Sequence, residues 1–336
     1  MKKTVAVLGT LCALSVSMSP AGAETLRLDA GSASSVTGIL PQAIAQYTAK
    51  EDINLEVILG QTLTKSIMKL AANRLDASLV PPPAFSAMSK GVGPYAQQAE
   101  PAKKLAGEVR SLTGLPGSTY HAITWADSGI EDWDDVRGKR VFVGPPAGAA
   151  NMQIIGMIEV ASGLEPESDY EAVRAPWNIA IQGFQDGQYD VLVTSAPVGQ
   201  QSINELSLQR EIRILGIPKS VLGTEAWKDY SDTAYMTSSV IPANTYAGQV
   251  NSDEDILTGS NIMYLAVNRK MDDDIAYRFT KAYWQNIDAI KTSNALLGDT
   301  NTSDPFAGIN APLHPGAVKY YQEAGIEIPE TLLVKQ

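Results

Sequence analysis

The segment KRVFVGPPAGAAN at residues 139–151 constrains the fold of this chain most strongly. A β-rich run at 141–143 stops at Gly144, and the two prolines that follow cannot continue the hydrogen bonding of a sheet. Apolar residues then recur at helical spacing through 152–160. This order predicts a strand, a tight turn of small residues and a helix, which direct backbone N–H groups at the space above the turn. An anion is the natural ligand there, but an ordinary strand-to-helix connection has the same pattern.

The alternation of strand and helix continues through the rest of the chain. Three expected strands and the two helices between them fall within residues 26–80. Helices that return the chain to a neighbouring strand are typical of a right-handed parallel sheet, so we predict the α/β class. The expected strands are at 26–28, 55–59, 75–80, 121–125, 141–143, 189–193, 212–215 and 263–267.

An acidic triplet is interpreted as a helix cap. Asp272, Asp273 and Asp274 come after a polar, turn-rich region at 246–260 and a strand-like run, and they precede helical spacing over 275–290. Carboxylates stabilise the positive end of a helix dipole and accept hydrogen bonds from its first N–H groups. The triplet therefore predicts the start of a long helix and no metal site.

The first residues have the features of an export signal. Lys2 and Lys3 precede an apolar run that is too short to span a bilayer, and a small-residue cleavage pattern ends at Ala23. We predict a signal peptide at 1–23 and hence a periplasmic protein. Cys12 lies in the part removed, so disulfides and thiolate chemistry are not expected in the mature chain. No later segment has the apolar length of a membrane helix, so stable membrane insertion is not expected.

Charge and length exclude some functions. The chain has 26 basic and 37 acidic residues, and removal of Lys2 and Lys3 leaves 24 basic residues, a net charge of about −13. Nucleic-acid partners need a basic surface, so nucleic-acid binding is not expected. The mature length of 313 residues (336 − 23) exceeds the usual size of a single core and predicts two domains.

Three segments carry a resemblance to a known family. They are WADSGI at 125–130, GKRVFVGPP at 138–146 and PLHPGAVKYY at 312–321, the last followed by Glu323 and Gly325. In order and spacing the mature chain resembles the TAXI family of solute-binding proteins, the receptors of one branch of the TRAP transporters. The resemblance implies a type II periplasmic-binding-protein fold, in which two α/β lobes enclose a ligand cleft at a hinge. It also implies a partner, the membrane-embedded TRAP permease, which uses an ion gradient.

The same resemblance implies lobes that are discontinuous in sequence. Family members cross between lobes at places that correspond to the strand-like runs at 121–125 and 263–267. Lobe 1 would then comprise residues 24–122 and 265–336, and lobe 2 would comprise residues 123–264. Two sequence-contiguous domains with one linker would contradict this expectation.

The candidate ligand-binding residues follow strands or begin helices. Loops at 31–38, 60–65 and 144–151 would converge on the cleft with hydroxyl, amide and N–H donors, and Trp177 and Pro197 follow two further strands. These donors favour a small organic carboxylate, such as glutamate or another amino acid, a dicarboxylate or a 2-oxo acid. The candidates are Gly31, Ser32, Ser35, Thr37, Thr62, Thr64, Lys65, Pro146, Ala147, Gly148, Ala149, Asn151, Trp177 and Pro197.

The chain departs from the TAXI family in the loops that would hold the ligand. Thr37–Gly38 stand where a pair of tyrosines is usual, and Ala149–Ala150 stand where hydroxyl residues are common. The ligand contacts of relatives therefore do not transfer, and the missing hydroxyls favour a ligand with a less polar tail than glutamate. Lys65 and Arg174 are both candidates for a cationic contact.

An exported α/β hydrolase or transferase is the alternative function. Ser66 and Lys69 match Ser-x-x-Lys, the nucleophile motif of penicillin-recognising enzymes, but the partner motifs are absent. The 2 histidines, His121 and His314, are too few for a histidine-rich metal site. The run at 251–255 lacks the glycine and the distant glutamate of an EF-hand loop. We therefore predict a binding protein without catalytic residues, metal or cofactor.

Overall fold

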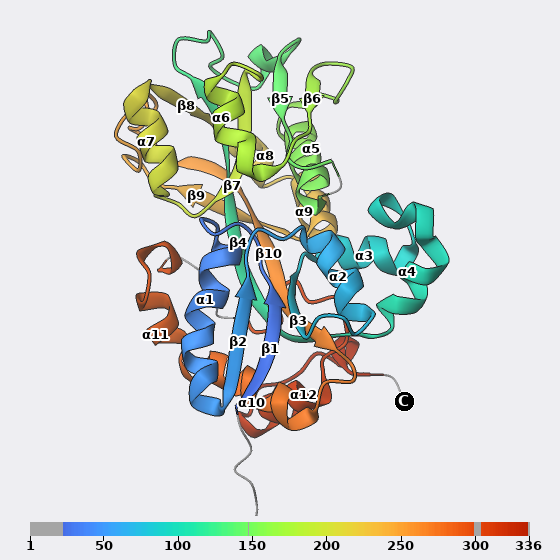
Figure 1. Cartoon of the computed structure of the whole chain (residues 1–336). Coiled ribbons are helices and arrows are strands. Elements are labelled where there is room, and N and C mark those ends of the chain that lie inside the picture. The colour runs from blue at the N-terminus through green and yellow to red at the C-terminus, as the bar shows by residue number, and fades with distance from the viewer. Residues whose placement is uncertain (1–22, 147, 299–303, 335–336) are drawn as a thin grey trace, which may run out of the picture.

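The chain forms two α/β lobes that two long strands connect (Figure 1). The structure is a computed structural model that describes residues 23–146, 148–298 and 304–334. Within these ranges, no helix combines the length and the apolar character that a membrane crossing requires. The predicted leader lies almost wholly outside the described residues.

Parallel strands form the centre of the first lobe. β1 (Glu24–Asp29) lies between β2 (Ile53–Ile58) and β3 (Ala77–Val80) and pairs in parallel with both. β3 is buried along its whole length, which is typical of a parallel strand covered by helices on both faces. The helices that follow these strands are α1 (Val36–Thr48), α2 (Leu63–Ala71) and α3 (Pro82–Lys90).

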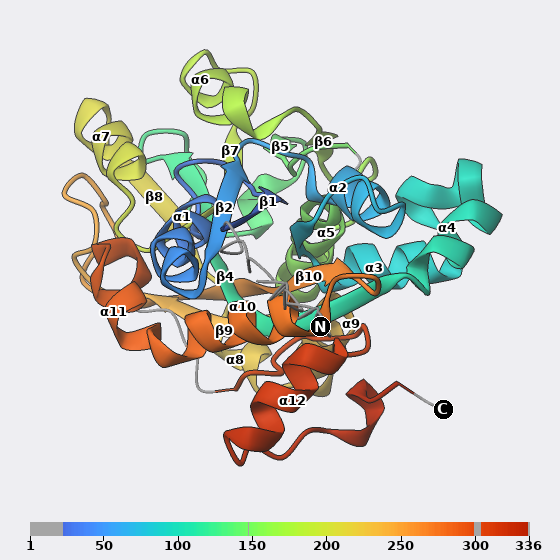
Figure 2. The same cartoon turned by 60° about the horizontal axis from the view of Figure 1, so that its bottom comes forward.

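Helices cover both faces of this sheet. Residues of α1, α10 (Asp273–Gln285) and α12 (Pro315–Glu323) share one core, and α10 and α12 lie side by side in Figure 2. Residues of α2, α3 and α4 (Ala99–Ala106) share the core on the other face. Along β3, Leu79 belongs to the first core and Val80 to the second, as the period of two in a strand requires.

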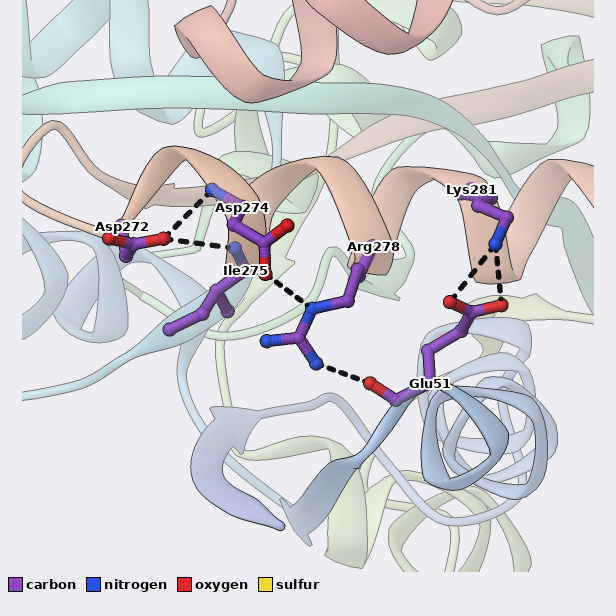
Figure 3. Close-up of polar contacts among 6 residues, drawn as sticks. All are labelled: Glu51, Asp272, Asp274, Ile275, Arg278 and Lys281. Atoms are coloured by element: carbon purple, nitrogen blue, oxygen red, sulfur yellow. Dashed lines mark hydrogen bonds and ion pairs between the residues drawn. The ribbon is translucent and has the colours of Figure 1, made fainter. Parts of the chain in front are cut away.

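The acidic triplet caps α10, as predicted. Asp272 Oδ1 accepts hydrogen bonds from the N–H groups of Asp274 at 2.8 Å and Ile275 at 3.4 Å (Figure 3). The expectation of one helix over 275–290 is wrong, because α10 ends at Gln285 and α11 (Ile287–Thr292) follows.

Two cations on α10 connect this helix to the short turn after α1. Lys281 Nζ lies 3.0 Å from Glu51 Oε1, and Arg278 donates to the Glu51 backbone oxygen and to Asp274 Oδ2 (Figure 3). These bonds fasten the start of β2 to the helix layer below it.

A second parallel sheet forms the other lobe. β5 (Arg140–Phe142) lies between β6 (Glu171–Val173) and β7 (Val191–Ala196). α5 (Ala149–Ser162) follows β5, which confirms the strand, turn and helix predicted around residues 139–151. The remaining elements are α6 (Ala180–Gln185), α7 (Gln201–Gln209), β8 (Ile212–Leu215), α8 (Lys219–Leu222), α9 (Glu225–Ala234) and β9 (Met236–Ile241).

The second lobe also has a core on each face of its sheet. Val141 and Val143 pack with residues of α5 and α9, whereas Phe142 packs with residues of α6 and α7. Because both faces are covered, all three residues are apolar, and the strand was recognisable from the sequence as a continuous β-rich run.

The two crossing strands are longer than the sequence predicts. β4 (Val109–Trp125) and β10 (Ile256–Asn268) pair antiparallel and run through both lobes. Strands were predicted only at 121–125 and 263–267, and the predicted turn-rich region extended to residue 260, although β10 already begins at Ile256. Glycines and a proline within 114–117 hide the strand character of β4.

The strand order identifies the fold class. Among the described residues the sheet runs β2-β1-β3-β10-β4-β7-β5-β6, with β8 beside β4 and β9 beside β10. The structure thus has the predicted type II periplasmic-binding-protein arrangement, two α/β lobes joined by crossing strands. The exact lobe boundaries stay a prediction.

Candidate functional site

The parallel strands of the two lobes end toward each other. β3 and β4 are both antiparallel to β10, so β1, β2 and β3 run from the first lobe toward the second, as β4 does. β7 is antiparallel to β4, and β5 and β6 are parallel to β7, so these strands run toward the first lobe. Open α/β sheets bind ligands beyond the carboxyl ends of their strands. The region between the lobes is therefore the candidate ligand site.

The loop after β1 folds back on itself. Ser35 Oγ donates to the Ser32 carbonyl oxygen at 2.8 Å and lies 2.7 Å from Thr37 Oγ1. Glycine is required at Gly31, because a β-carbon there would lie 2.1 Å from Thr37 Oγ1. The Gly60 N–H donates to the Gly31 carbonyl oxygen at 2.8 Å, which joins this loop to the one after β2. Two of the three predicted loops therefore meet, and the hydroxyls of Ser35 and Thr37 bond to each other.

The start of α2 carries the candidates of the second loop. Thr62 is the N-cap residue, but its side chain makes no capping hydrogen bond. Thr64 is buried, and its carbonyl oxygen accepts a hydrogen bond from the Tyr95 hydroxyl at 2.7 Å. Lys65 is exposed. Thr62 and Lys65 are thus accessible at this end of α2, whereas Thr64 faces the core.

The Ser-x-x-Lys match has a structural explanation. Ser66 Oγ donates to Asp29 Oδ2 at 2.7 Å, and Lys69 Nζ lies 3.0 Å from the same oxygen. Asp29 is buried at the end of β1, where a carboxylate needs such partners. Ser66 therefore donates to Asp29 and not to Lys69, and Lys69 is in an ion pair with the same oxygen, so the lysine of the motif is not placed to take the serine proton. The pair therefore neutralises and positions Asp29.

The loop after β5 depends on a left-handed glycine and a bracing amide. Gly144 has a φ of 86°, a conformation that side chains rarely adopt. Asn151 Nδ2 donates to the Val143 carbonyl oxygen at 3.0 Å, so the amide group holds the end of the strand. This side chain supports the loop from the first turn of α5.

The other candidates in this loop differ in exposure. Pro146 is exposed, and Gly148 is the N-cap of α5. Ala149 is buried in the first turn of the helix. Ala147 lies outside the described residues.

Trp177 packs against the same loop. Its ring meets the Phe142 ring edge to face at 5.6 Å, and a β-carbon on Gly144 would lie 3.3 Å from its six-membered ring. The side chain is half-buried. Trp177 therefore joins the ends of β5 and β6, and the remaining surface of the indole is accessible.

The two cationic candidates are in different environments. Arg174 lies 2.8 Å from Glu167 Oε1 and also donates to the Ala172 carbonyl oxygen at 2.9 Å. Lys65 has an exposed side chain on the first turn of α2. The charge of Arg174 is already compensated within the second lobe.

A cavity of 300 Å³ lies where the lobes meet the crossing strands. Of the predicted site residues it includes Pro197, at the end of β7. Val36, the first residue of α1, lines it from the first lobe. Most of the wall comes from β4, β9 and β10, including Ser118, Thr119, Ser239 and Asn261. We call this space the hinge cavity.

A β-bulge shapes the hinge cavity. Thr119 pairs with Ser260, but Pro116 pairs with Ile262, so β4 has one extra residue opposite β10. Gly117 permits the close approach, since a β-carbon there would lie 1.9 Å from Asn261 Oδ1. Bulges of this kind redirect side chains next to functional sites.

The residues of the bulge connect both lobes. The Ser118 N–H donates to Asn261 Oδ1 at 2.9 Å, and Asn261 Nδ2 donates to Ser195 Oγ of β7 at 3.0 Å. Ser118 Oγ accepts a hydrogen bond from the Val36 N–H at 3.3 Å. The first N–H of α1 is thus linked through the hinge to the end of β7.

A buried histidine supports the hinge cavity from behind. His121 Nδ1 lies 3.0 Å from the Thr119 carbonyl oxygen, and His121 Nε2 lies 2.8 Å from the Tyr246 hydroxyl. Burial lowers the pKa of His121 to about 4, so the imidazole is neutral near pH 7. Thr119 in turn places its hydroxyl 3.0 Å from Ser239 Oγ in the cavity wall.

The polar residues that line the hinge cavity were not among the candidates predicted from the sequence. Ser118, Thr119, Ser239 and Asn261 come from three strands and meet only through the bulge. The available signal was the run GLPGST at 114–119, in which polar and small residues interrupt an otherwise apolar strand.

A second hollow lies on the surface of the second lobe, away from the hinge cavity. An open depression of 520 Å³ lies between α5 and α9. It is lined by Gly156, Glu159 and Tyr230, toward the far end of α5 from the strand ends. No group of three or more His, Cys, Asp or Glu residues within the described part of the chain is arranged to hold a metal ion.

A match to a protein family covers both lobes of this structure. The NMT1-like family matches residues 30–325, which is most of the chain. The chain belongs to the NMT1-like family. This match includes both lobes and the crossing strands, and the narrower TAXI assignment stays a prediction.

Several solved structures resemble this NMT1-like chain over most of its length. The alkanesulfonate-binding protein SsuA from Xanthomonas axonopodis pv. citri, bound to MOPS, is 12% identical over 90% of this chain and 92% of its own, with a TM-score of 0.49. The aliphatic sulphonate-binding SsuA from Escherichia coli is 12% identical over 89% and 83%, with a TM-score of 0.47. The ectoine-binding protein of the TeaABC TRAP transporter from Halomonas elongata is 11% identical over 89% and 90%, with a TM-score of 0.46. The ligands in these names are those of the neighbouring proteins.

Proposed function

We propose that this chain is an exported solute-binding receptor that delivers a small organic carboxylate to a membrane permease. The observation that carries the proposal is the arrangement of the lobes, whose parallel strands end toward one another across β4 and β10. The hinge cavity of 300 Å³ at the crossing is large enough for a small molecule. Rotation of the lobes about the crossing strands would enclose the ligand from both sides.

The helices that begin at the strand ends support a carboxylate as the ligand. The N-cap residues Ser35 of α1 and Thr62 of α2 make no side-chain capping bond, and the N-cap of α5 is Gly148, which has no side chain to cap the helix. Each helix dipole would contribute about 0.3–1 kcal/mol toward a negative charge, and each charge-assisted hydrogen bond about 1.5–3 kcal/mol. Lys65 is the cation proposed for this role, because Arg174 is already in an ion pair.

The receptor would belong to the TAXI type and work with a TRAP permease in the periplasm. Support comes from the segments at 125–130, 138–146 and 312–321, which resemble that family. Cleavage after Ala23 would release a chain that begins at Glu24, the first residue of β1. The proposed ligand contacts remain the loops at the strand ends, together with Trp177 and Pro197.

The hydrolase alternative has no support from its candidate nucleophile. Ser66 donates a hydrogen bond to Asp29, and Lys69 forms an ion pair with the same carboxylate, so the lysine is not placed to accept the serine proton. A binding protein should return its ligand unchanged, whereas an enzyme would consume it. Recovery of the ligand after prolonged incubation therefore separates the two functions.

The proposal is tested by thermal shift and calorimetry with the mature chain. The panel contains amino acids, dicarboxylates, 2-oxo acids, sugars and inorganic cations. We expect a carboxylate to raise the melting temperature and to be recovered intact by chromatography, since a ligand that binds only the folded state stabilises it. Stabilisation by a neutral sugar or a cation alone would contradict the carboxylate assignment, and turnover would contradict the receptor assignment.

Tryptophan fluorescence tests the position of the ligand. Trp177 lies at the strand ends, whereas Trp125 stacks on Phe184 at 4.5 Å in the second lobe. We expect a ligand-dependent fluorescence change that Trp177→Phe abolishes, with affinity reduced roughly fivefold through lost aromatic contact. The matched variant Trp125→Phe should retain both the signal and the affinity. Unchanged affinity in Trp177→Phe would mean that Trp177 only packs the lobe.

A further inference from the structure

The hinge cavity has a wall of neutral hydrogen-bonding groups. Ser118, Thr119, Ser239 and Ser260 contribute hydroxyls, and Asn261 contributes an amide. Among the described lining residues there is no lysine, arginine or histidine. The chemistry of this wall differs from that of the strand-end loops, where helix dipoles and Lys65 favour negative charge.

One residue with a carboxylate side chain lies in the lining of the cavity. Asp304 is the ionisable side chain among the described lining residues. Its Oδ1 accepts a hydrogen bond from the Phe306 N–H at 2.8 Å, which fixes the side chain to its own turn. The Gly114 N–H donates to the Pro305 carbonyl oxygen at 2.7 Å, so this turn is fastened to β4.

The close approach of this turn to β4 requires glycine. A β-carbon on Gly114 would lie 2.6 Å from the Ala307 carbonyl oxygen. Backbone contacts therefore hold the turn of Asp304 beside the bulge, and Asp304 has no ion pair with another described residue. Asp304 is exposed and contributes the negative charge among cavity-lining residues that, where described, are otherwise neutral.

The hydroxyls can accept as well as donate. Ser118 Oγ already accepts from the Val36 N–H, and the hydroxyls of Thr119 and Ser239 share one hydrogen bond. A hydroxyl retains a further acceptor lone pair when it takes part in one bond. A ligand group that donates hydrogen bonds would thus find partners here, including the Asp304 carboxylate.

We propose that the hinge cavity receives the end of the ligand that donates hydrogen bonds and carries no negative charge. The inference rests on the proposed binding of a carboxylate at the strand-end loops. It narrows the ligand to a monocarboxylate whose other end is an amide, hydroxyl or ammonium group. A dicarboxylate would place its second charge near the Asp304 carboxylate, where the described lining residues supply no cation, and the two negative charges would repel each other.

Matched ligand pairs test this selectivity by calorimetry at pH 7.5. The pairs are glutamine with glutamate, asparagine with aspartate, and 4-hydroxybutyrate with succinate. We expect the first member of at least one pair to bind about tenfold or more tightly than the second, because the pairs differ chiefly in one negative charge. Pairs in which neither member binds are set aside. If, in every pair that binds, the dicarboxylate binds at least as tightly as the monocarboxylate, the inference is overturned and the receptor proposal stays intact.

Variants of Asp304 assign the selectivity to this side chain. Asp304→Asn keeps an acceptor for the Phe306 N–H and removes the charge, so the preference within a pair should fall several-fold. Asp253→Asn is the matched control, because Asp253 is exposed like Asp304 but lies outside the lining of the cavity. An unchanged ratio in Asp304→Asn with an unchanged melting temperature would overturn the role of Asp304.

A second variant covers the case in which Asp304→Asn does not fold. Ser239→Lys places a cation in the cavity wall and should shift preference toward the dicarboxylate of each pair. The same ratio as in the unmodified chain would contradict the inference. If no carboxylate of either kind binds the unmodified chain, the carboxylate proposal itself is wrong and the inference fails with it.

Discussion

Among single residues, His121 links protonation to the stability of the hinge. The Gly199 N–H donates to the Tyr246 oxygen at 3.1 Å, so the Tyr246 hydroxyl proton is free to point at His121 Nε2. His121 Nδ1 then carries the proton and donates to the Thr119 carbonyl oxygen. A neutral imidazole satisfies both of these bonds, whereas a second proton on Nε2 would oppose the Tyr246 hydroxyl in a buried site.

We predict that the hinge loses stability on acidification through His121. Burial lowers the pKa of His121 to about 4 in the folded chain, while an unfolded histidine has a pKa of about 6.5. The unfolded state binds the proton first, so this contribution is complete above pH ~6.5 and is lost as the pH falls toward ~4. Through His121 alone, the free energy of unfolding changes by at most about 1.4 kcal/mol per pH unit. Urea unfolding at several pH values measures it.

The control for this prediction uses the other histidine. His121→Gln should be less stable than the unmodified chain at pH 7.5 but should lose stability less steeply between pH 6.5 and 4.5. Burial also lowers the pKa of His314, so His314→Gln measures how much of the slope belongs to that residue. An unchanged slope in His121→Gln would show that His121 does not titrate as described.

At the scale of elements, the bulge in β4 decides how the two lobes are joined. Its extra residue lies between the pairs Thr119 with Ser260 and Pro116 with Ile262. Gly117→Ala would place a β-carbon 1.9 Å from Asn261 Oδ1 and 2.1 Å from its backbone oxygen. We expect this change to lower the free energy of unfolding by about 2–4 kcal/mol, because backbone must move to relieve the overlap.

Gly223→Ala is the matched control for the bulge. Gly223 ends α8 with a φ of −95°, and a β-carbon there would meet no atom within 4 Å. Its stability should change by less than about 1 kcal/mol in either direction. Equal effects of the two substitutions in denaturant melts would contradict the importance of the bulge.

The elements that the sequence predicted are those whose pattern is local. Val141 and Val143 alternate with Phe142 between two cores, and the acidic triplet caps the helix it precedes. β4 was recognised only in part, because Gly114 and Gly117 serve close approaches to other segments that the local sequence does not reveal. The loops at the strand ends were predictable, since small residues follow strands there.

The hinge cavity was not predictable from the sequence for a physical reason. Ser118, Asn261 and Ser239 lie on three strands, and only the register of β4 against β10 brings them together. That register depends on a bulge rather than on alternation of apolar residues. The sequence therefore predicted the loops at the helix starts as candidate ligand contacts, and it did not reveal the residues that line the hinge cavity.

At the scale of the whole molecule, a polar contact links the two lobes beside the crossing strands. The Ser86 and Tyr235 hydroxyl oxygens, from α3 and the end of α9, lie 3.4 Å apart. Asn310 Nδ2 donates to Ser86 Oγ at 2.9 Å and thereby orients this hydroxyl. Each lobe has its own cores, so the lobes can rotate about β4 and β10 without exposing a shared core.

We predict that the bound ligand closes the two lobes proposed at 24–122 with 265–336 and at 123–264. Small-angle scattering should show a radius of gyration that falls from roughly 20 Å when a stabilising carboxylate saturates the chain. Hydrogen exchange should slow at both 31–38 and 144–151, because the ligand would bind loops from both lobes. A sugar that does not stabilise the chain is the control and should change neither quantity. Protection confined to one loop, with an unchanged radius at saturation, would contradict closure about the crossing strands.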